Sequence, residues 1–160
     1  MNYGVVVITV SDGVARGDRE DKSGPALVDA LQTVKLQIVA TEIVPDEMQT
    51  IIDTLQKYVQ RNDVHLIMTT GGTGFGPRDV TPEATRHVID RPAPGIAELL
   101  RQAGAQQTQL TWLSRAEAGI ADNKLIINLP GSPKAMEHSV QTLLPVLFHA
   151  LDLLNGAKPH

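Results

Sequence analysis

The segment 69–81 places glycines between a short apolar run and a predicted helix start, an order that suits the binding of a phosphate group. Its sequence is TTGGTGFGPRDVT, which contains Gly71, Gly72, Gly74 and Gly76. Glycine lacks the Cβ atom that would keep a ligand away from the backbone. A helix start adds free N–H groups and the positive end of the helix dipole. We therefore expect this loop to contact an anion.

Neither familiar nucleotide-binding pattern is present in this loop. The chain has no Gly-Lys-Ser/Thr ending of a P-loop, and Pro77 stands where a dinucleotide fingerprint needs its third glycine. A tight turn between a strand and a helix would also explain the glycines. On the pattern alone, phosphate binding and a purely structural turn both stay open.

Three aspartates, Asp12, Asp46 and Asp79, each stand just after a predicted strand. Mg²⁺ suits such a set, because one or two carboxylates usually hold it together with substrate phosphates. The metal would neutralise charge during phosphoryl or nucleotidyl transfer, which needs positioning rather than a protein nucleophile. The alternative is structural: Asp46 would cap the following helix, and Asp79 would pair with Arg78 or cap the turn into Thr81.

Two cations lie close to predicted helix starts, where they oppose the helix dipole unless an anion is bound nearby. Arg78 follows the glycine loop, and Lys134 lies in the first turn after Ser132 in PGSPK. Both are candidate phosphate ligands. Ser132 is first of all a predicted N-cap, with phosphate contact as a second role.

The elements that position these residues alternate between strand and helix. Apolar or alternating runs predict strands over 4–10, 35–44, 66–70 and 125–129. Helical patterns follow them, which predicts an α/β fold with a parallel sheet covered by helices on both faces. Ligands of such folds bind outside the carboxyl ends of the strands, at one edge of the sheet.

Amphipathic spacing and helix-start residues predict helices that begin near Ser23, Met48, Thr81, Gly95 and Pro133. Ser23 and Thr81 are expected to cap their helices, with Pro82 as a first helical residue. Met48, Ile51, Ile52 and Leu55 form a stripe that we expect in the core. Residues 14–22 are predicted to be a mobile solvated loop, and 108–120 has mixed periodicity and receives no assignment.

Composition excludes several classes of protein. The chain has no cysteine, so it has neither a disulfide framework nor a thiolate nucleophile. A formal charge of −4 without a basic tract, and an aromatic content of 3%, argue against nucleic-acid or membrane-surface binding. No apolar segment is long enough to span a bilayer, so we expect a cytoplasmic protein. Residues 1–160 are expected to form one domain.

Two common catalytic centres are also not indicated. None of the 5 histidines forms an H-x-x-x-H or H-E-x-x-H pair of the kind that binds zinc. There is no G-x-S-x-G elbow, and Ser132 in PGSP lacks the second glycine, which argues against a serine hydrolase.

Six motifs run along the chain: ITVSDG at 8–13, DKSGPAL at 21–27, VPDE at 44–47, TTGGTGFGPRDVTPEAT at 69–85, SRAEAG at 114–119 and NLPGSPKA at 128–135. In this order they resemble the molybdopterin adenylyltransferase family of molybdenum cofactor biosynthesis, the MogA/MoaB-like proteins. The similarity covers nearly the whole chain, and the glycine-loop and LPGSPKA blocks are specific to molybdopterin-binding domains.

The resemblance implies a three-layer α/β/α fold, a homotrimer, and a Mg²⁺-dependent enzyme with ATP and molybdopterin as substrates. Its reaction is the transfer of AMP to the terminal phosphate of molybdopterin with release of pyrophosphate, followed by hand-over of the product to a molybdenum insertase.

Site residues carry over position by position from the matching motifs. Asp46 and Asp79 match the family's two functional aspartates, which implies that they hold Mg²⁺, directly or through water. Other positions match the phosphate-contacting loop and the pterin and nucleotide cleft: Gly72, Thr73, Gly74, Ser11, Asp12, Ser114, Gly131 and Ser132.

A different class of function is kept beside this one. The chain could be a catalytically inactive molybdopterin-binding carrier or scaffold that passes the pterin to a partner. A paralogous branch of the family lacks both aspartates, whereas this sequence keeps them, which favours activity. An insertase-like role ranks last, because insertases of the superfamily carry further domains that 160 residues do not hold.

Overall fold

The fold is built around β1 (Gly4–Val10), whose sequence GVVVITV is buried at every position. The computed structural model describes residues 2–158 of the chain. β1 pairs with β2 (Gln37–Val44) on one side and with β3 (Leu66–Thr70) on the other, in both cases parallel. A continuous β-branched run is what a strand covered on both faces requires, so this part of the prediction is confirmed.

Six strands form one sheet in the order β2-β1-β3-β6-β5-β4. β6 (Lys124–Leu129) lies parallel to β3. β5 (Ala118–Ala121) pairs antiparallel with β6, and the short β4 (Arg91–Pro92) pairs antiparallel with β5. Because β2 and β3 lie on opposite sides of β1, the strand order reverses at β1. The turns after β1 and β3 diverge there, which is where ligands bind in open α/β sheets.

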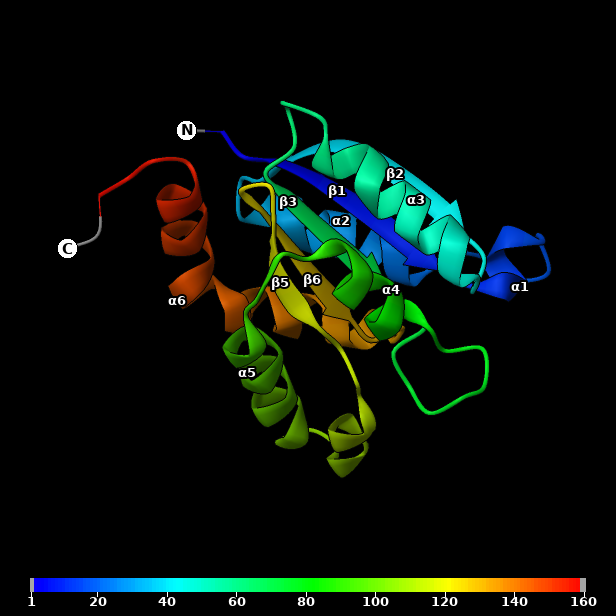
Figure 1. Ribbon diagram of the computed structural model, residues 1–160. Coiled ribbons are helices and arrows are strands. Elements are labelled where there is room, and N and C mark those ends of the chain that lie inside the picture. Colours follow the sequence, from blue (N-terminus) through cyan, green and yellow to red (C-terminus); the bar gives the residue numbers. More distant parts are fainter. Residues whose placement is uncertain (1, 159–160) are drawn as a thin grey trace.

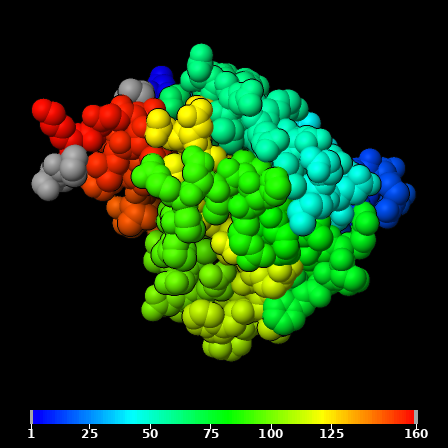
Figure 2. Space-filling model, viewed as in Figure 1, coloured from blue at the N-terminus to red at the C-terminus, as the bar shows by residue number. Residues whose placement is uncertain are grey.

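Helices form a layer on each face of the sheet (Figure 1). α3 (Met48–Val59) and α4 (Thr81–Val88) cover one face, which Figure 2 shows as the near side of the molecule. α2 (Ser23–Thr33), α5 (Pro94–Ala105) and α6 (Met136–Leu154) pack against the other. The expected three-layer α/β/α fold with a mostly parallel sheet is therefore confirmed.

The structure adds short elements that periodicity did not predict. α1 (Asp12–Ala15) occupies the start of the segment expected to be a mobile loop, and Ser11 Oγ accepts a hydrogen bond from Val14 N (3.2 Å) at its start. η1 (Gln109–Leu113) and β5 lie in the segment that received no assignment. η2 (Pro133–Ala135) precedes α6, and Ser132 caps it without a side-chain hydrogen bond. Elements of three to five residues are too short to show a helical or strand period.

Several predicted helix caps are wrong, because the N-cap residues of α2, α3 and α4 are Lys22, Glu47 and Val80. Asp21 Oδ1, rather than Ser23, accepts from the backbone at the start of α2, from Gly24 N (3.0 Å). Thr81 Oγ1 donates to Gly71 O (3.0 Å) and so ties the helix start to the glycine loop. α3 begins after Glu47, not after a cap at Asp46.

The expected core stripe of α3 is shorter than predicted. Ile51, Ile52 and Leu55 are buried, but Met48 is 40% exposed, since it begins the helix at the edge of the sheet. Among residues 2–158 we also find no helix with the length and apolar character needed to cross a membrane.

A fully buried amide links the sheet to α4. Asn128 Nδ2 donates to Thr69 Oγ1 (2.9 Å) on β3 and to Thr85 Oγ1 (3.0 Å) on α4. Its Oδ1 accepts from Glu117 N (3.1 Å), just before β5. One side chain therefore joins three elements, and its removal leaves buried polar groups without partners.

We expect Asn128→Ala to lower the free energy of unfolding by about 3 kcal/mol, because a buried N–H loses its acceptor and a cavity forms. Urea titration followed by circular dichroism measures this change. Asn62→Ala is the matched control, because Asn62 is exposed, and it should leave the unfolding midpoint unchanged. Equal midpoints for the two variants would contradict the structural role of Asn128.

Candidate active site

A cavity of about 850 Å³ opens at the carboxyl ends of β1, β3 and β6. It lies at the edge of the sheet that the sequence predicts. Nine of the candidate residues line it: Ser11, Asp46, Gly71, Gly72, Thr73, Gly74, Asp79, Ser114 and Gly131. Segments that lie far apart in the sequence thus meet in one hollow.

Four candidates do not line this cavity. Ser132 and Lys134 line a neighbouring hollow of about 390 Å³, which shares Ser114 with the main cavity. Asp12 and Arg78 form an ion pair with each other. Lys134 is therefore placed to act in the second hollow rather than in the first.

The glycine loop meets the end of β1 so closely that side chains do not fit. Gly71 has φ +98°, and a Cβ atom on it would overlap Val10 O. Gly72 has φ +69°, and its Cβ would overlap Thr81 Oγ1 and come within 2.9 Å of Asp46 Oδ1. Only glycine adopts this backbone without strain, and its absent side chains leave room for a ligand.

Asp12 and Asp46 brace the turns after β1 and β2 against each other. Asp12 N donates to Asp46 Oδ2 (2.9 Å), and Asp46 N donates to Asp12 Oδ1 (3.0 Å). This reciprocal pair explains why Asp46 is not a helix cap, because its carboxylate is turned toward the neighbouring turn. Burial costs a charged group less when backbone N–H groups bond to it.

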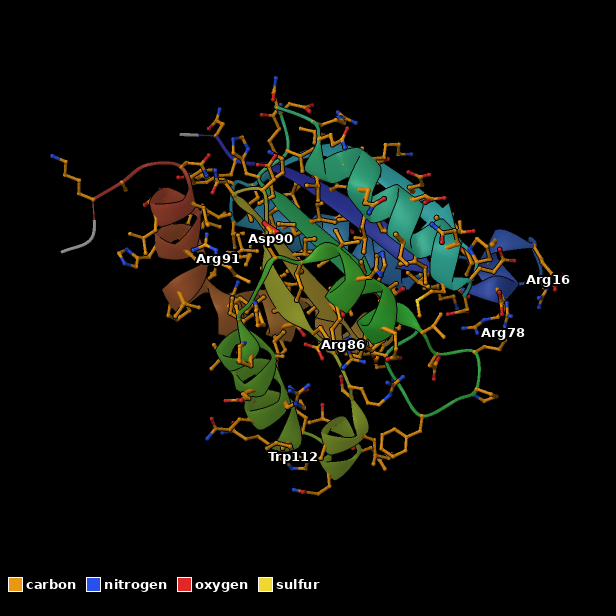
Figure 3. The ribbon with its side chains drawn as sticks, in the orientation of Figure 1. Arg16, Arg78, Arg86, Asp90, Arg91 and Trp112 are labelled. Atoms are coloured by element: carbon orange, nitrogen blue, oxygen red, sulfur yellow. The ribbon has the colours of Figure 1, made fainter. Side chains whose placement is uncertain are left out.

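Arg78 pairs with Asp12 and not with Asp79. Its Nε donates to Asp12 Oδ2 (3.0 Å) and its Nη2 to Oδ1 (3.1 Å), and Figure 3 shows the side chain beside α1. The hydrogen bond from Arg78 lowers the pKa of Asp12 below its ordinary value. The expected pairing of Asp79 with Arg78 is therefore wrong, and Asp12 carries a charge that is already compensated.

Asp46 has an uncompensated oxygen. Among the described residues, nothing bonds to Asp46 Oδ1, although that atom is buried. Burial raises the pKa of Asp46, and repulsion by Asp12 and Asp79 acts in the same direction. A buried carboxylate oxygen with no donor, close to a glycine turn, fits a bound cation.

The donor set is small. Residues 2–158 contain no group of three or more His, Cys, Asp or Glu placed to bind a metal. Asp46 and Asp79 both line the cavity, and Asp79 Oδ2 accepts from Gly76 N (2.9 Å). Two carboxylates are enough for Mg²⁺ when substrate phosphates and water complete the octahedron. The residues present therefore fit a Mg²⁺ ion that arrives with a nucleotide.

The structure adds cavity residues that the sequence analysis missed. Arg19 and Lys22 are cations in the cavity wall, and both come from the segment expected to be a solvated loop. Asp21 also lines it, and its Oδ2 accepts from Thr9 Oγ1 (2.8 Å). The sequence signal that could have indicated their role is the run of charged residues directly after the first strand, because a simple connecting loop does not need so many charges.

The exposed residues Leu110 and Leu113 of η1 form an apolar part of the same wall. They carried no motif in the sequence. A hollow with one polar and one apolar side suits a ligand that has phosphates at one end and a ring at the other.

Known proteins resemble this chain over most of its length. A family model described as "Probable molybdopterin binding domain" matches residues 6–149. The chain is 38% identical over 152 residues to the molybdopterin adenylyltransferase of Helicobacter pylori strain J99, covering 94% of this chain and 86% of that protein.

Other relatives are longer. The chain is 43% identical to the molybdenum cofactor synthesis protein cinnamon of Drosophila melanogaster, covering 92% of this chain and 25% of that protein. It is also 43% identical to a molybdenum cofactor biosynthesis bifunctional protein of Synechococcus elongatus, covering 94% of this chain and 47% of that protein. The chain thus spans about a quarter and about half of these two relatives.

Solved structures show the same fold. The molybdopterin biosynthesis enzyme MoaB of Thermus thermophilus superposes with a TM-score of 0.90 at 45% identity, covering 97% of this chain and 98% of that one. The Mog protein of Mycobacterium ulcerans superposes with a TM-score of 0.89 at 34% identity, covering 98% and 99%. On sequence and structure together, this chain belongs to the molybdopterin-binding domain family of molybdenum cofactor biosynthesis.

Proposed function

We propose that this protein is a molybdopterin adenylyltransferase, which transfers AMP from Mg-ATP to the terminal phosphate of molybdopterin and releases pyrophosphate. The observation that carries the proposal is Asp46, whose buried oxygen without a hydrogen-bond partner among the described residues lies beside the Gly72 turn in the cavity that Asp79 also lines. Relatives named as molybdopterin adenylyltransferases, at 38% identity over most of their length, support it.

In this reaction an oxygen of the molybdopterin phosphate attacks the α-phosphorus of ATP. A new P–O bond forms, the bond to the β-phosphate breaks, and pyrophosphate leaves with the electron pair. Both reacting groups are phosphates, so the protein supplies alignment and relief of charge rather than a nucleophile. Mg²⁺, when Asp46 and Asp79 hold it, supplies a Lewis acid that neutralises developing negative charge.

The remaining tasks fall to the chain's own groups. Gly72, Thr73 and Gly74 line the cavity, and their backbone N–H groups would contact phosphate oxygens. Arg19 and Lys22 in the wall attract an anionic substrate. The apolar side formed by Leu110 and Leu113 is suited to a substrate ring and excludes water from the phosphates.

Assembly and partners belong to the same proposal. We propose a homotrimer of single-domain chains in the cytoplasm that hands adenylated molybdopterin to a molybdenum insertase. The name of one longer relative, a "bifunctional protein", supports a second activity working beside this domain. In a separate chain, that second activity would come from a partner.

Asp79→Asn should lower kcat by roughly 100-fold or more, because the neutral side chain would no longer balance the charge of the Mg²⁺ ion that accompanies the phosphates. An amide oxygen can still accept from Gly76 N, so the loop and the fold should survive. Purified protein with molybdopterin, Mg²⁺ and labelled ATP provides the assay, and circular dichroism checks the fold. The control is Asp53→Asn, an exposed acid on α3, which should retain full activity.

Wild-type protein that binds molybdopterin tightly in calorimetry, yet neither binds Mg-ATP nor forms the adenylated product, would be the carrier rather than the enzyme.

Asp46→Asn should also lower kcat, and in addition it should raise the stability of the folded protein at neutral pH. Burial raises the pKa of Asp46, so between its ordinary value of 3.8 and the raised value the folded protein binds more protons than the unfolded chain. Stability is therefore lost as the pH rises through this window, and the loss persists at pH 7. The neutral variant should be more stable than the wild type at neutral pH and no different at low pH, as thermal unfolding would reveal. A destabilised variant at pH 7 would argue against an uncompensated buried charge.

Gly72→Ala should weaken ATP binding measured by calorimetry, because a Cβ atom would fill the space beside Asp46 and strain the backbone by about 1–2 kcal/mol. Gly95→Ala is the matched control, since a Cβ there meets nothing within 4 Å in α5. Unchanged ATP affinity in Gly72→Ala would show that the turn does not contact the nucleotide.

A further inference from the structure

Arg115 contacts the glycine loop at several points, although it is not among the residues that line the cavity. Its Nε donates to Gly74 O (2.8 Å), and its Nη2 donates to Asp79 O (2.8 Å). Its backbone N donates to Thr73 O (2.8 Å). Arg115 therefore bonds to both ends of the span between Thr73 and Asp79.

The same guanidinium is anchored to the start of α4. Its Nη1 donates to both carboxylate oxygens of Glu83, at 2.9 and 2.8 Å. This bond lowers the pKa of Glu83, which stays charged. The positive charge of Arg115 is thereby balanced, so the side chain bridges loop and helix instead of presenting a free cation to a substrate.

The loop has few other restraints. Residues 75–78 are exposed. Within this part, Asp79 N donates to Gly76 O (3.0 Å) and Gly76 N donates to Asp79 Oδ2 (2.9 Å). These bonds shape the turn. The Arg78 side chain attaches it to Asp12 on α1, and Arg115 attaches its main chain at Gly74 and at Asp79.

We propose that Arg115 is a positioning residue for the adenylyl transfer: it closes the loop between Gly74 and Asp79 and so holds the Asp79 carboxylate in the cavity. This proposal rests on the proposed function for its catalytic consequence, and on geometry alone for its effect on the loop. The planar guanidinium provides five N–H donors in a fixed fork, which is what two carbonyls and a carboxylate require. A lysine ammonium does not reproduce that fork.

Arg86 offers a matched comparison. It pairs with the same Glu83, through Nη2 to Oε2 (2.8 Å), and with Glu117, through Nη1 to Oε1 (2.9 Å). It belongs to the same cluster of charges but has no bond to the glycine loop among the contacts of the described residues. Arg86→Gln therefore removes a cation from the cluster and leaves the loop attached.

The experiment compares Arg115→Ala, Arg115→Lys and Arg86→Gln with the wild type. Amide hydrogen exchange of Gly76 and Asp79, followed by NMR, reports on the loop, and steady-state kinetics reports kcat and KM separately. Arg115→Ala should exchange these amides about tenfold faster or more. Its kcat should fall on the order of 100-fold, with a much smaller change in the KM for molybdopterin, because displacement of Asp79 affects the reacting centre. The exchange rates and the kcat of Arg115→Lys should lie between those of Arg115→Ala and the wild type. Arg86→Gln should match the wild type in both readouts.

Wild-type exchange and wild-type kcat in Arg115→Ala would overturn the proposal. So would equal effects of Arg86→Gln and Arg115→Ala, because the cause would then be the shared charge cluster. If the alanine variant does not fold, the lysine variant decides in the same way, since it keeps the charge and most of the side chain. If the wild type has no transferase activity, the proposed function fails, while the exchange rates still decide whether Arg115 closes the loop.

Discussion

The reciprocal hydrogen bonds between Asp12 and Asp46 are the constraint on which the site depends. Each carboxylate accepts the other residue's backbone N–H, so the turns after β1 and β2 hold each other in place. The arrangement needs one oxygen from each acid. Arg78 donates to both oxygens of Asp12, whereas among the described residues the second oxygen of Asp46 has no partner. The same pair of residues therefore both holds the turns in place and leaves one carboxylate oxygen without a hydrogen-bond donor.

That distribution of charge has a functional consequence. Asp12 is compensated by an arginine, whereas Asp46 is half-buried with one fully buried oxygen, has a raised pKa, and is repelled by two neighbouring acids. A protein that needed only stability would gain nothing from such an oxygen. A cation accompanied by phosphates would compensate it, and the glycine turn beside it provides the space and the N–H groups for those phosphates.

The glycine loop is held from two opposite sides. On the inner side, Gly71 packs against Val10 O, and Thr81 Oγ1 donates to Gly71 O. On the outer side, Arg115 bonds to the carbonyls of Gly74 and Asp79. Loops that bind phosphate must be permissive in their own dihedral angles, so their rigidity has to come from neighbours.

The amino-acid sequence alone predicts the alternation of strands and helices, the edge of the sheet where the cavity opens, and the presence of Asp46, Asp79 and the glycines at that edge. These follow from local periodicity and from the rule that parallel strands end on one side. Which polar side chains meet becomes visible in the folded chain: Arg78 with Asp12 across 66 positions, Arg115 with the glycine loop, and Asn128 with Thr69 and Thr85. The structure also shows that Arg19 and Lys22, which are exposed as the solvated loop predicts, line the cavity. The reason is physical, because hydrogen bonds and ion pairs between side chains depend on distances in space, and no local pattern records which distant residues the packing of a sheet brings together.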